Sequence, residues 1–439
     1  MSFPRYPSYK DSGVEWLGEV PGHWEVTALK RGFNVTLGKM LQPESSSPDD
    51  ELLPYLRAAN IQWGGIDTTD IKQMWLSKRD RAQLCLESGD LLVSEGGDVG
   101  RSCLWEAELD NCYFQNSVNR VRARDGHSNR YLYYWISTIK DKGYIDVLCN
   151  KSTIAHFTAE KVAAVPVPLP TPDEQTQIAA FLDRETAKID ALVAEQRRLV
   201  ELLKEKRQAV ISHAVTQGLN PHAPMKPSGI EWLGDVPAHW VTPSLYMRYS
   251  SELGKMLDSS KITGDHLIPY VRNVDVQWGA INLDDLPFMD IREDEHQRYT
   301  IKAGDLLICE GGEVGRAAIV PTMNGVFGYQ KALHRLRALK DDENTKFMYF
   351  TLLWAANTGV FNLSGSSTIA HLTGEQLRKY RFPKPPIAEQ AQIVAVLETE
   401  TAKLDTLTAE AQRAIDLLQE RRSALISAAV TGQIDVRPH

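Results

Sequence analysis

Two stretches of the chain decide its architecture: "EQTQIAAFLDRETAKIDALV" (174–193) and "EQAQIVAVLETETAKLDTLT" (389–408). Both place apolar residues three and four positions apart, which is the pattern of a long helix with one apolar face. Their offset is 389 − 174 = 215 residues, about half of the chain. A similar repetition joins "SGVEWLGEVPGHW" (12–24) to "SGIEWLGDVPAHW" (228–240). The chain therefore contains two copies of one structural unit.

Each copy begins with a strand-rich part. Short apolar runs bounded by Gly, Asp and Pro, such as "YLRAANIQW" (55–63) and "DLLVSEGG" (90–97), indicate strands and turns. The segment "RYLYYWISTI" (130–139) has the broad apolar face of a short helix. The second copy gives the same order of elements.

A long helix follows each strand-rich part. In the first copy Thr171 is a favourable N-cap, Pro172 suits the first helical position, and Glu174 completes a capping box. Gly218 and Pro221 end the helix. At ~1.5 Å per residue, the intervening segment without Pro or Gly predicts a rod of roughly 65 Å.

The long helices each carry an apolar seam, so each needs a partner. The seam residues are Ile178, Leu182, Ile189, Leu192, Leu199, Leu203 and Val210 in the first helix, and Ile393, Leu397, Leu404, Leu407, Leu418 and Leu425 in the second. The other copy supplies the nearest partner. We therefore expect an antiparallel coiled coil with pseudo-twofold symmetry between the copies.

These patterns predict an α+β fold made of two tandem mixed α/β domains, each followed by a long helix. The expected boundaries are 1–170 for the first domain, 171–220 for the first helix, 221–385 for the second domain and 386–439 for the second helix. The copies differ most at 42–54 and 258–269, which is typical of exchangeable surface loops on a constant scaffold.

The composition is that of a globular protein rather than a membrane protein. We find no apolar run long enough to span a bilayer and no signal peptide, so we expect a cytoplasmic protein. The five cysteines form no CxxC pair, which favours reduced thiols over a disulfide framework or a zinc site. The formal net charge of −8 argues against a protein that grips nucleic acid alone by neutralising phosphates.

We find no catalytic motif in either copy. "GFNVTLGKM" (32–40) resembles a phosphate loop, but it has one residue too many and ends in Met40 where Ser or Thr would hold magnesium. "EGGDVGR" (95–101) is typical of a tight turn between strands. His156 and His371 recur in both copies and are typical of structural hydrogen bonding. We predict no metal site and no catalytic residue, and therefore a non-enzymatic chain.

The sequence closely resembles the specificity subunits of type I restriction-modification systems. The residues that carry the resemblance are "YKDSGVEWLGEVPGHWEV" (9–26), "GDLLVSEGGDVGR" (89–101), "QNSVNRVRA" (115–123), "STIAHFT" (152–158) and the long helix from "LPTPDEQTQI" to "VTQG" (169–218). Each has a counterpart in the second copy. The resemblance covers essentially the whole chain.

The resemblance implies a function. Each globular part is expected to be a target recognition domain that reads one half of a bipartite target in double-stranded DNA. The helices are expected to set the gap between the halves and to dock two methylation subunits. Those partners are expected to carry S-adenosylmethionine and to methylate adenine, while restriction and translocation subunits cut the DNA. This chain itself is expected to hold no cofactor.

Arginine and lysine pair with guanine edges, and asparagine and glutamine with adenine edges. On this basis the predicted base-reading residues are Lys39, Gln42, Arg57, Asn60, Gln62, Arg101, Gln115 and Asn116 in the first copy, and Lys255, Arg272, Asn273, Gln277, Arg316, Gln330 and Lys331 in the second. Any of them can instead be structural. Because the copies are alike, we expect half-sites that share bases. The loops 42–54 and 258–269, and "AAN" (58–60) against "NVD" (273–275), are expected to carry the difference.

Two other classes of protein remain open at this stage. A two-lobed scaffold that binds only proteins would also explain the repeat and fits the acidic charge slightly better. An enzyme acting alone is a more distant alternative. DNA binding that requires a methylation subunit would distinguish the first alternative from a specificity subunit, and methyl transfer by the purified chain would favour the second.

Overall fold

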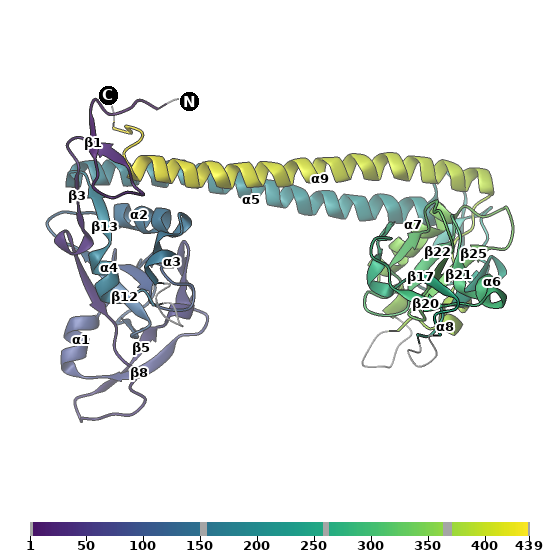
Figure 1. Cartoon of the computed structure of the whole chain (residues 1–439), viewed down its shortest axis with the longest axis horizontal. Helices are drawn as coiled ribbons and strands as arrows, with labels where there is room; N and C mark the ends of the chain where they lie inside the picture. The colour runs from purple at the N-terminus through teal and green to yellow at the C-terminus, as the bar shows by residue number, and fades with distance from the viewer. Residues whose placement is uncertain (1–2, 150–155, 258–262, 363–370, 438–439) are drawn as a thin grey trace. The chain divides into compact units, whose positions relative to one another are not determined.

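The computed structural model describes residues 3–149, 156–257, 263–362 and 371–437. The chain divides into two compact units, with residues 1–196 and 413–439 in unit 1 and residues 197–412 in unit 2. Helices α5 (Pro172–Gln217) and α9 (Ile387–Val430) each contribute residues to both units (Figure 1). Each unit therefore combines the strand-rich part of one copy with segments of both long helices.

Unit 1 is built on two main sheets. Its strands are β1 (Tyr9–Asp11), β2 (Glu19–Pro21), β3 (Glu25–Ala28), β4 (Phe33–Leu37), β5 (Glu51–Leu56), β6 (Ile61–Gln62), β7 (Gly65–Ile66), β8 (Lys72–Leu76), β9 (Leu91–Ser94), β10 (Ser102–Leu104), β11 (Tyr113–Phe114), β12 (Val118–Ala123) and β13 (Pro166–Leu169). One sheet has the order β10-β9-β12-β4 and is antiparallel. The other has the order β11-β5-β8, with β11 parallel to β5.

Short helices cover these sheets. They are α1 (Lys78–Leu84), α2 (Asn129–Asp141), α3 (Tyr144–Cys149) and α4 (Ala159–Ala164). The predicted helix at 130–139 is thus confirmed as α2, whose Tyr131 and Trp135 are fully buried in the main core of the unit. A second core, which includes Leu56 and Phe114, lies between the sheets. Figure 1 shows β5 and β8 at the end of unit 1 away from the long helices.

Unit 2 repeats this plan. Its strands are β14 (Met225–Pro227), β15 (Asp235–Pro237), β16 (Tyr249–Leu253), β17 (Leu267–Val271), β18 (Val276–Gln277), β19 (Ala280–Ile281), β20 (Phe288–Asp290), β21 (Thr300–Ile301), β22 (Leu306–Cys309), β23 (Ala317–Ile319), β24 (Phe327–Tyr329) and β25 (Leu333–Ala338), and its short helices are α6 (His296–Tyr299), α7 (Thr345–Asn357) and α8 (Gly374–Lys379). The sheet β16-β25-β22-β23 matches β4-β12-β9-β10 strand for strand. The parallel pair of β24 and β17 matches that of β11 and β5.

The long helices run antiparallel within each unit, as the apolar seams predicted. In unit 1, Ile178 near the start of α5 shares a core with Ile426 near the end of α9, and Val193 packs with Ile415. In unit 2, Arg207 Nε lies 2.9 Å from Asp405 Oδ1, and Val215 further along α5 shares a core with Ile393 and Leu397. Advancing along α5 therefore meets successively earlier residues of α9 in both units.

The seam prediction is wrong at three positions. Leu192, Leu199 and Leu407 are 45, 41 and 48% exposed, whereas Val193 and Val200 are buried. Steps that alternate strictly between four and three residues lead from 182 through 186, 189, 193 and 196 to 200 and 203, so the valines occupy the seam positions. The prediction chose Leu192 and Leu199, which directly precede the buried valines, because leucine is the larger apolar residue. The other predicted seam residues are buried or partly buried: Ile178, Leu182, Ile189, Leu203, Val210, Ile393, Leu397, Leu404, Leu418 and Leu425.

The repeated "HW" dipeptides explain why the opening motif recurs. In unit 1, His23 Nε2 lies 2.9 Å from Glu174 Oε2, and the Trp24 indole donates to Glu174 Oε1 at 3.2 Å. In unit 2, His239 Nε2 lies 2.7 Å from Glu389 Oε2. The motif thus holds the first turn of each long helix against its unit. Glu174 does not complete the predicted capping box, because its carboxylate bonds to His23 and Trp24 instead.

The glutamine after each of these glutamates joins the helix to the short helix beside it. Gln175 accepts from the backbone N–H of Ser128, the N-cap of α2, at 3.0 Å, and Gln390 accepts from Asn344, the N-cap of α7, at 2.8 Å. Both glutamines are completely buried. The repeated "EQ" pairs therefore fix the scaffold of each unit. Across the residues described, no helix is long and apolar enough to cross a membrane.

Candidate nucleic-acid interface

Loops that are distant in sequence meet at one edge of unit 1. Lys39 forms a parallel backbone bridge with Gln115, and the Ser117 hydroxyl accepts from the Ala58 N–H at 3.1 Å. The Arg101 guanidinium donates to the Ala58 carbonyl at 2.9 Å. We call this surface, formed by Lys39–Leu41, Arg57–Asn60, Arg101 and Gln115–Ser117, edge 1.

Unit 2 assembles the equivalent surface from equivalent residues. Lys255 bridges to Gln330 in parallel, and the Asn273 amide donates to the Ala332 carbonyl at 3.3 Å. The Arg316 guanidinium donates to the Asn273 carbonyl at 3.0 Å. We call this surface, formed by Lys255–Leu257, Arg272–Asp275, Arg316 and Gln330–Ala332, edge 2. The structure thus brings most of the predicted base-reading residues together, once in each unit.

A glycine holds the strands of each edge in close approach. A Cβ atom on Gly38 would overlap the backbone carbonyl of Gln115, and one on Gly254 would overlap that of Gln330. The "LGKML" motif is therefore not a phosphate loop: its glycine permits backbone contact inside the protein. It fixes the position of the residues on both sides of the bridge.

Carboxylates neutralise most of the basic side chains at the edges. Lys39 Nζ lies 2.7 Å from Asp80 Oδ2 and Arg57 lies 2.8 Å from Asp70. Hydrogen bonds, first from Arg57 and then from Lys72, hold the pKa of the Asp70 carboxyl below its usual value. Edge 1 thus carries little unneutralised positive charge at these positions.

Edge 2 has the same arrangement with different partners. Lys255 Nζ lies 2.6 Å from Glu295 Oε2, and two guanidinium nitrogens of Arg272 donate to Asp275 at 2.7 and 2.8 Å. Burial raises the pKa of Asp275, but the hydrogen bonds from Arg272 outweigh burial and lower it overall. Arg316 lies 3.4 Å from Glu313. The acidic residues that outnumber the basic ones in the sequence therefore also pair with the basic side chains of edge 2.

Several predicted amide readers are used within the protein. Asn60 is buried, accepts from the Arg57 N–H at 3.0 Å and donates to the Asp67 carbonyl at 2.9 Å. The remaining amides bond to nearby groups: Gln42 to Glu44, Ser46 and Asp50, Gln62 to Ala59, Asn273 to Gly311 and Ala332, and Gln277 to Val274. Asn60 and Asp275, the third residues of "AAN" and "NVD", are both buried caps, whereas the second residues, Ala59 and Val274, are exposed. The prediction that these segments carry the difference between the half-sites therefore stays a prediction.

Four predicted readers have uncommitted side chains. Among the residues that the structure describes, Gln115, Asn116, Gln330 and Lys331 make no side-chain hydrogen bond or ion pair. The first three are half-buried and Lys331 is exposed. Their backbones are anchored while their polar groups are available, which is the combination that direct reading of a base edge requires.

Sequence reasoning missed a pair of apolar side chains beside each bridge. Met40 and Leu41 are 75 and 46% exposed, and Met256 and Leu257 are 66 and 42% exposed. Apolar side chains at a DNA interface contact thymine methyl groups or base steps. The signal was present in the sequence, because "LGKML" is retained next to the most variable loop.

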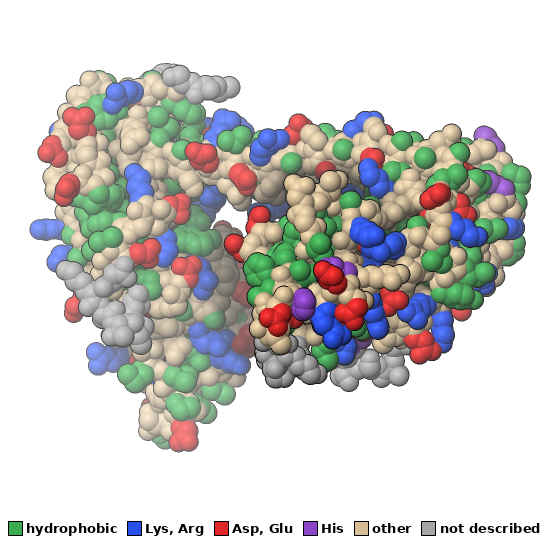
Figure 2. Space-filling view, turned by 45° about the vertical axis from the view of Figure 1, so that its right-hand side comes forward, with side chains coloured by type: hydrophobic (Ala, Val, Ile, Leu, Met, Phe, Trp, Pro, Cys, Tyr) green, Lys and Arg blue, Asp and Glu red, His purple; other side chains and the backbone are tan. Residues whose placement is uncertain are grey.

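The viewed face of unit 2 is not strongly basic. Figure 2 shows Lys and Arg side chains interspersed with Asp and Glu over the viewed face of unit 2. This mixed surface agrees with the formal net charge of −8. It fits selective polar contacts better than strong phosphate neutralisation by this chain alone.

The recurring histidines lie beside residues that bond to these edges. His156 is next to Glu95, whose N–H donates to the Ser117 carbonyl, and His371 is next to Gly311, whose carbonyl accepts from Asn273. His156 Nδ1 lies 3.9 Å from Glu95 Oε1, and burial raises the pKa of Glu95. The residues "STIA" at 152–155 and 367–370 lie outside the described residues, as does 258–262 of the second variable loop. The prediction that loops 42–54 and 258–269 differ in function therefore stays a prediction.

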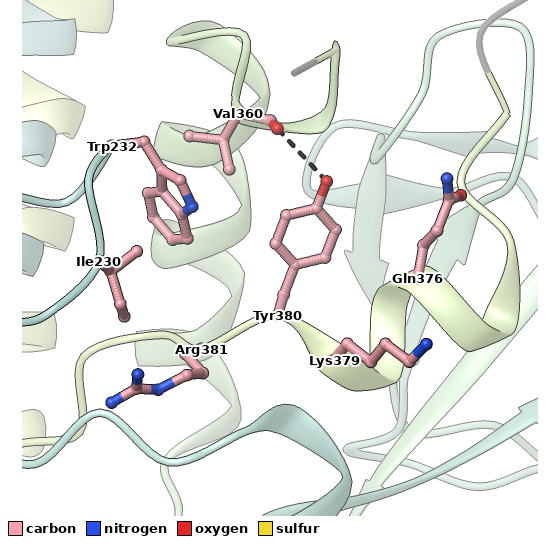
Figure 3. Close-up of a pocket in the computed structure, with 7 residues that line it drawn as sticks. All are labelled: Ile230, Trp232, Val360, Gln376, Lys379, Tyr380 and Arg381. Carbon is pink, nitrogen blue, oxygen red and sulfur yellow. Dashed lines mark hydrogen bonds between the residues drawn. The ribbon is translucent and has the colours of Figure 1, made fainter. Parts of the chain in front are cut away.

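A separate cavity of about 340 Å³ lies in unit 2 (Figure 3), lined by Ile230, Trp232, Val360, Gln376, Lys379, Tyr380 and Arg381. In unit 1 the ring of Tyr144 lies 4.5 Å from that of Trp16, whereas Val360 occupies the place of Tyr144 in unit 2. Tyr380 donates to the Val360 carbonyl at 3.3 Å. The cavity therefore follows from a packing difference between the copies, and none of the predicted readers lines it.

Comparisons with known proteins show which family the chain resembles. A family model for the type I restriction modification DNA specificity domain matches residues 21–202 and 251–416. The specificity subunit of the type I restriction enzyme EcoKI from Escherichia coli strain K12 is 23% identical, over 95% of this chain and 90% of that protein. The putative MjaX specificity subunit from Methanocaldococcus jannaschii is 22% identical, over 96% of each chain.

Solved structures share the fold. A chain from a structure of a type I R-M system, described for its complex assembly and conformational transition, aligns with a TM-score of 0.72 at 16% identity and covers 94% of this chain and 98% of that one. The HsdS subunit from Thermoanaerobacter tengcongensis aligns with a TM-score of 0.58 at 17% identity, with the same coverage. At this level of identity the likeness supports the fold alone.

Proposed function

The chain belongs to the type I restriction-modification DNA specificity family, and from this premise we propose that each of its units reads one half of a bipartite double-stranded DNA target. The observation that carries the proposal is the pair of equivalent edges. Each ends in uncommitted polar side chains on a fixed backbone: Gln115 and Asn116 on edge 1, and Gln330 and Lys331 on edge 2. These groups match the hydrogen-bonding edges of bases in the major groove.

The neutralised arginines and lysines have a positioning role in this proposal. Arg57 and Arg272 hold the backbone of their edges through their own ion pairs. The phosphate contacts that give most of the affinity for DNA would then come mainly from partner subunits. The chain would add selectivity to a complex whose affinity others supply.

The long helices are proposed to set the gap between the half-sites and to dock two methylation subunits. Apolar side chains that lie outside the seam support the docking: Leu192, Leu199, Leu202, Leu407 and Leu417 are exposed on α5 and α9. Neighbouring exposed apolar side chains are typical of protein interfaces, and Leu199 and Leu202 lie three residues apart, on the same face of α5. The docked subunits would bind S-adenosylmethionine and methylate adenine, and restriction and translocation subunits would cleave the DNA.

A map of adenine methylation across the genome of the source cell tests this function. We expect one split motif to be methylated when the gene is intact and to lose its methylation when the gene is deleted. The motif would report both half-sites and the gap. Copurification of the chain with a methylation subunit controls for an inactive system. Identical maps together with an assembled, active methylation complex would contradict the proposal.

A second experiment separates DNA reading from a scaffold that binds only proteins. The assembled complex should discriminate the mapped duplex from one with both half-sites scrambled. Complexes with alanine at Gln115, Asn116, Gln330 and Lys331 should assemble normally but lose that discrimination. Equal binding of both duplexes by the unaltered complex would favour the scaffold.

A further inference from the structure

Asn116 and Lys331 occupy the same place in two matching backbone frames. The Asn116 N–H donates to the Lys39 carbonyl at 2.9 Å, and the Lys331 N–H donates to the Lys255 carbonyl at 3.0 Å. The preceding residue is glutamine in both copies. Both side chains therefore leave the backbone at equivalent points of their edges.

The residues that follow are held equally. The Ser117 carbonyl accepts from the Glu95 N–H at 2.9 Å, and the Ala332 carbonyl accepts from the Glu310 N–H at 3.0 Å. Because backbone hydrogen bonds hold the chain at residues 116 and 331 and at the residues that follow them, the backbone has the same position in both copies. The side chains at 116 and 331 therefore differ in chemistry and not in where they leave the backbone. The two copies thus form a natural comparison in which one polar side chain without a partner among the described residues changes, from Asn116 to Lys331.

The change alters the hydrogen-bonding chemistry. The Asn116 amide has both a donor and an acceptor, whereas the Lys331 ammonium has donors only. Adenine presents a donor and an acceptor in the major groove, and guanine presents two acceptors. Of the other differences nearby, Asn60 and Asp275 are buried caps and Asn273 bonds to its own unit, whereas Ala59 and Val274 are exposed but carry no polar side-chain group that could hydrogen-bond a base.

We infer that residues 116 and 331 distinguish the two half-sites: Asn116 reads an adenine, and Lys331 reads a guanine at the corresponding position of the other half-site. This inference rests on the proposed reading function. It identifies one position at which otherwise related half-sites differ, and it assigns that difference to one residue in each unit. Gln115 and Gln330 would contact the bases that the half-sites share.

Reciprocal substitutions test the assignment. The full chain carrying Asn116→Lys, or separately Lys331→Asn, is assembled with its methylation subunits and titrated with a panel of duplexes. The panel contains the mapped target and every single-base change in either half. Asn116→Lys should shift the preference from adenine to guanine at one position of the first half, by about 5- to 150-fold. Lys331→Asn should cause the opposite shift at the corresponding position of the second half.

The matched control is Lys302→Asn, the same chemical change on an exposed residue of unit 2. Lys302 precedes the first residue of β22, whereas Glu310, which bonds to Ala332 of edge 2, follows the last residue of this strand. The control therefore lies at the opposite end of β22 from edge 2. This variant should bind the panel like the unaltered chain. If Asn116→Lys does not assemble, Asn116→Ala serves instead, and it should flatten the preference at one position of the first half only.

The outcomes separate the inference from the function on which it rests. If the unaltered complex shows no bipartite preference, the proposed function fails. If that preference is present but the variants at 116 and 331 leave every base preference unchanged, only the inference is overturned. A loss of preference spread over several positions or over both halves would also overturn it, because it would indicate a structural role.

Discussion

Gly38 and its counterpart Gly254 are the residues at which the edges tolerate least change. A methyl group on Gly38 would meet a backbone carbonyl rather than a side chain that can rotate away. We expect Gly38→Ala to lower the free energy of unfolding by about 1–3 kcal/mol, as other overpacking substitutions do. We also expect it to weaken base discrimination in the first half-site, because Gln115 and Asn116 depend on this contact. Urea denaturation and the duplex panel measure the two effects.

Gly65→Ala is the control for that substitution. Gly65 lies in β7, and a Cβ atom there would meet nothing within 4 Å. The control should change the free energy of unfolding by no more than about 0.5 kcal/mol. Equal effects of the two substitutions would mean that the close approach at Gly38 does not constrain the edge.

The Lys39–Asp80 ion pair gives edge 1 a defined dependence on pH. Burial raises the pKa of the Asp80 carboxyl, but hydrogen bonds from Lys39 and Ser77 outweigh burial and lower it from 3.8. A lowered folded pKa means that the pair stabilises the unit fully above that usual value and loses this effect as the pH falls through the folded pKa. Asp80→Asn should therefore cost about 0.5–1 kcal/mol near pH 7. The difference from the unaltered chain should shrink below about pH 4.

Thermal unfolding of both proteins from pH 3 to pH 8 measures this difference. The amide oxygen that the substitution introduces can still accept the bonds from Ser77, so the N-cap of α1 is kept. A difference that grows on acidification would contradict the assigned sign. The same variant frees Lys39, so its complex should bind unrelated DNA more tightly at low salt.

The sequence identified which polar residues recur, but not which of them form hydrogen bonds or ion pairs within their own unit. Asp80 lies 41 positions from Lys39, and Asp70 lies 13 positions from Arg57. Such pairs depend on the packing of distant loops, so no local spacing indicates them. This is why most of the predicted readers have partners inside their units, while Gln115, Asn116, Gln330 and Lys331 stay available.

At the scale of elements, the register of the helix pair separates two neighbouring residues. Val193 is buried against Ile189 and Ile415, whereas Leu192 is exposed. Val193→Ala should lower the free energy of unfolding by about 1–3 kcal/mol because it leaves unfilled space in the seam. Leu192→Ala should change it by about 0.5 kcal/mol or less. Chemical denaturation of the two variants checks the register directly.

The same two variants bear on the docking role of the helices. Copurification with the methylation subunit should be weakened by Leu192→Ala despite its unchanged stability. If Leu192→Ala unfolds as easily as Val193→Ala, the assigned register is wrong. If it assembles normally, the exposed leucine at this position does not contribute to docking.

The helices were predictable from the sequence because their signals are local. The cap at Thr171 and the glycine at Gly218 bracket α5, and alternating steps of four and three residues define its seam. The sheets were less predictable. The parallel pairing of β11 with β5 joins residues far apart in the chain, and no periodicity within either strand encodes it.

At the scale of the whole molecule, the repeat itself is informative. In both units a histidine contacts the glutamate in the first turn of the long helix. In both units a glycine lies against a glutamine carbonyl at the edge. The copies differ in residues that lie on this common frame, such as Tyr144 against Val360 and Asn116 against Lys331. A duplicated frame with changed surface residues allows two related but distinct half-sites to be read by one chain.

This modularity predicts the outcome of replacing one domain by the other. A chain in which residues 1–170 are replaced by 221–385 retains α5 and α9 but carries the second domain twice. Its complex should methylate a target that contains the second half-site twice, with the original gap, because the helices are unchanged. The methylation map of cells that express only this chain measures the result. Retention of the first half-site, or an altered gap with intact half-sites, would show that specificity or spacing resides outside the segments assigned here.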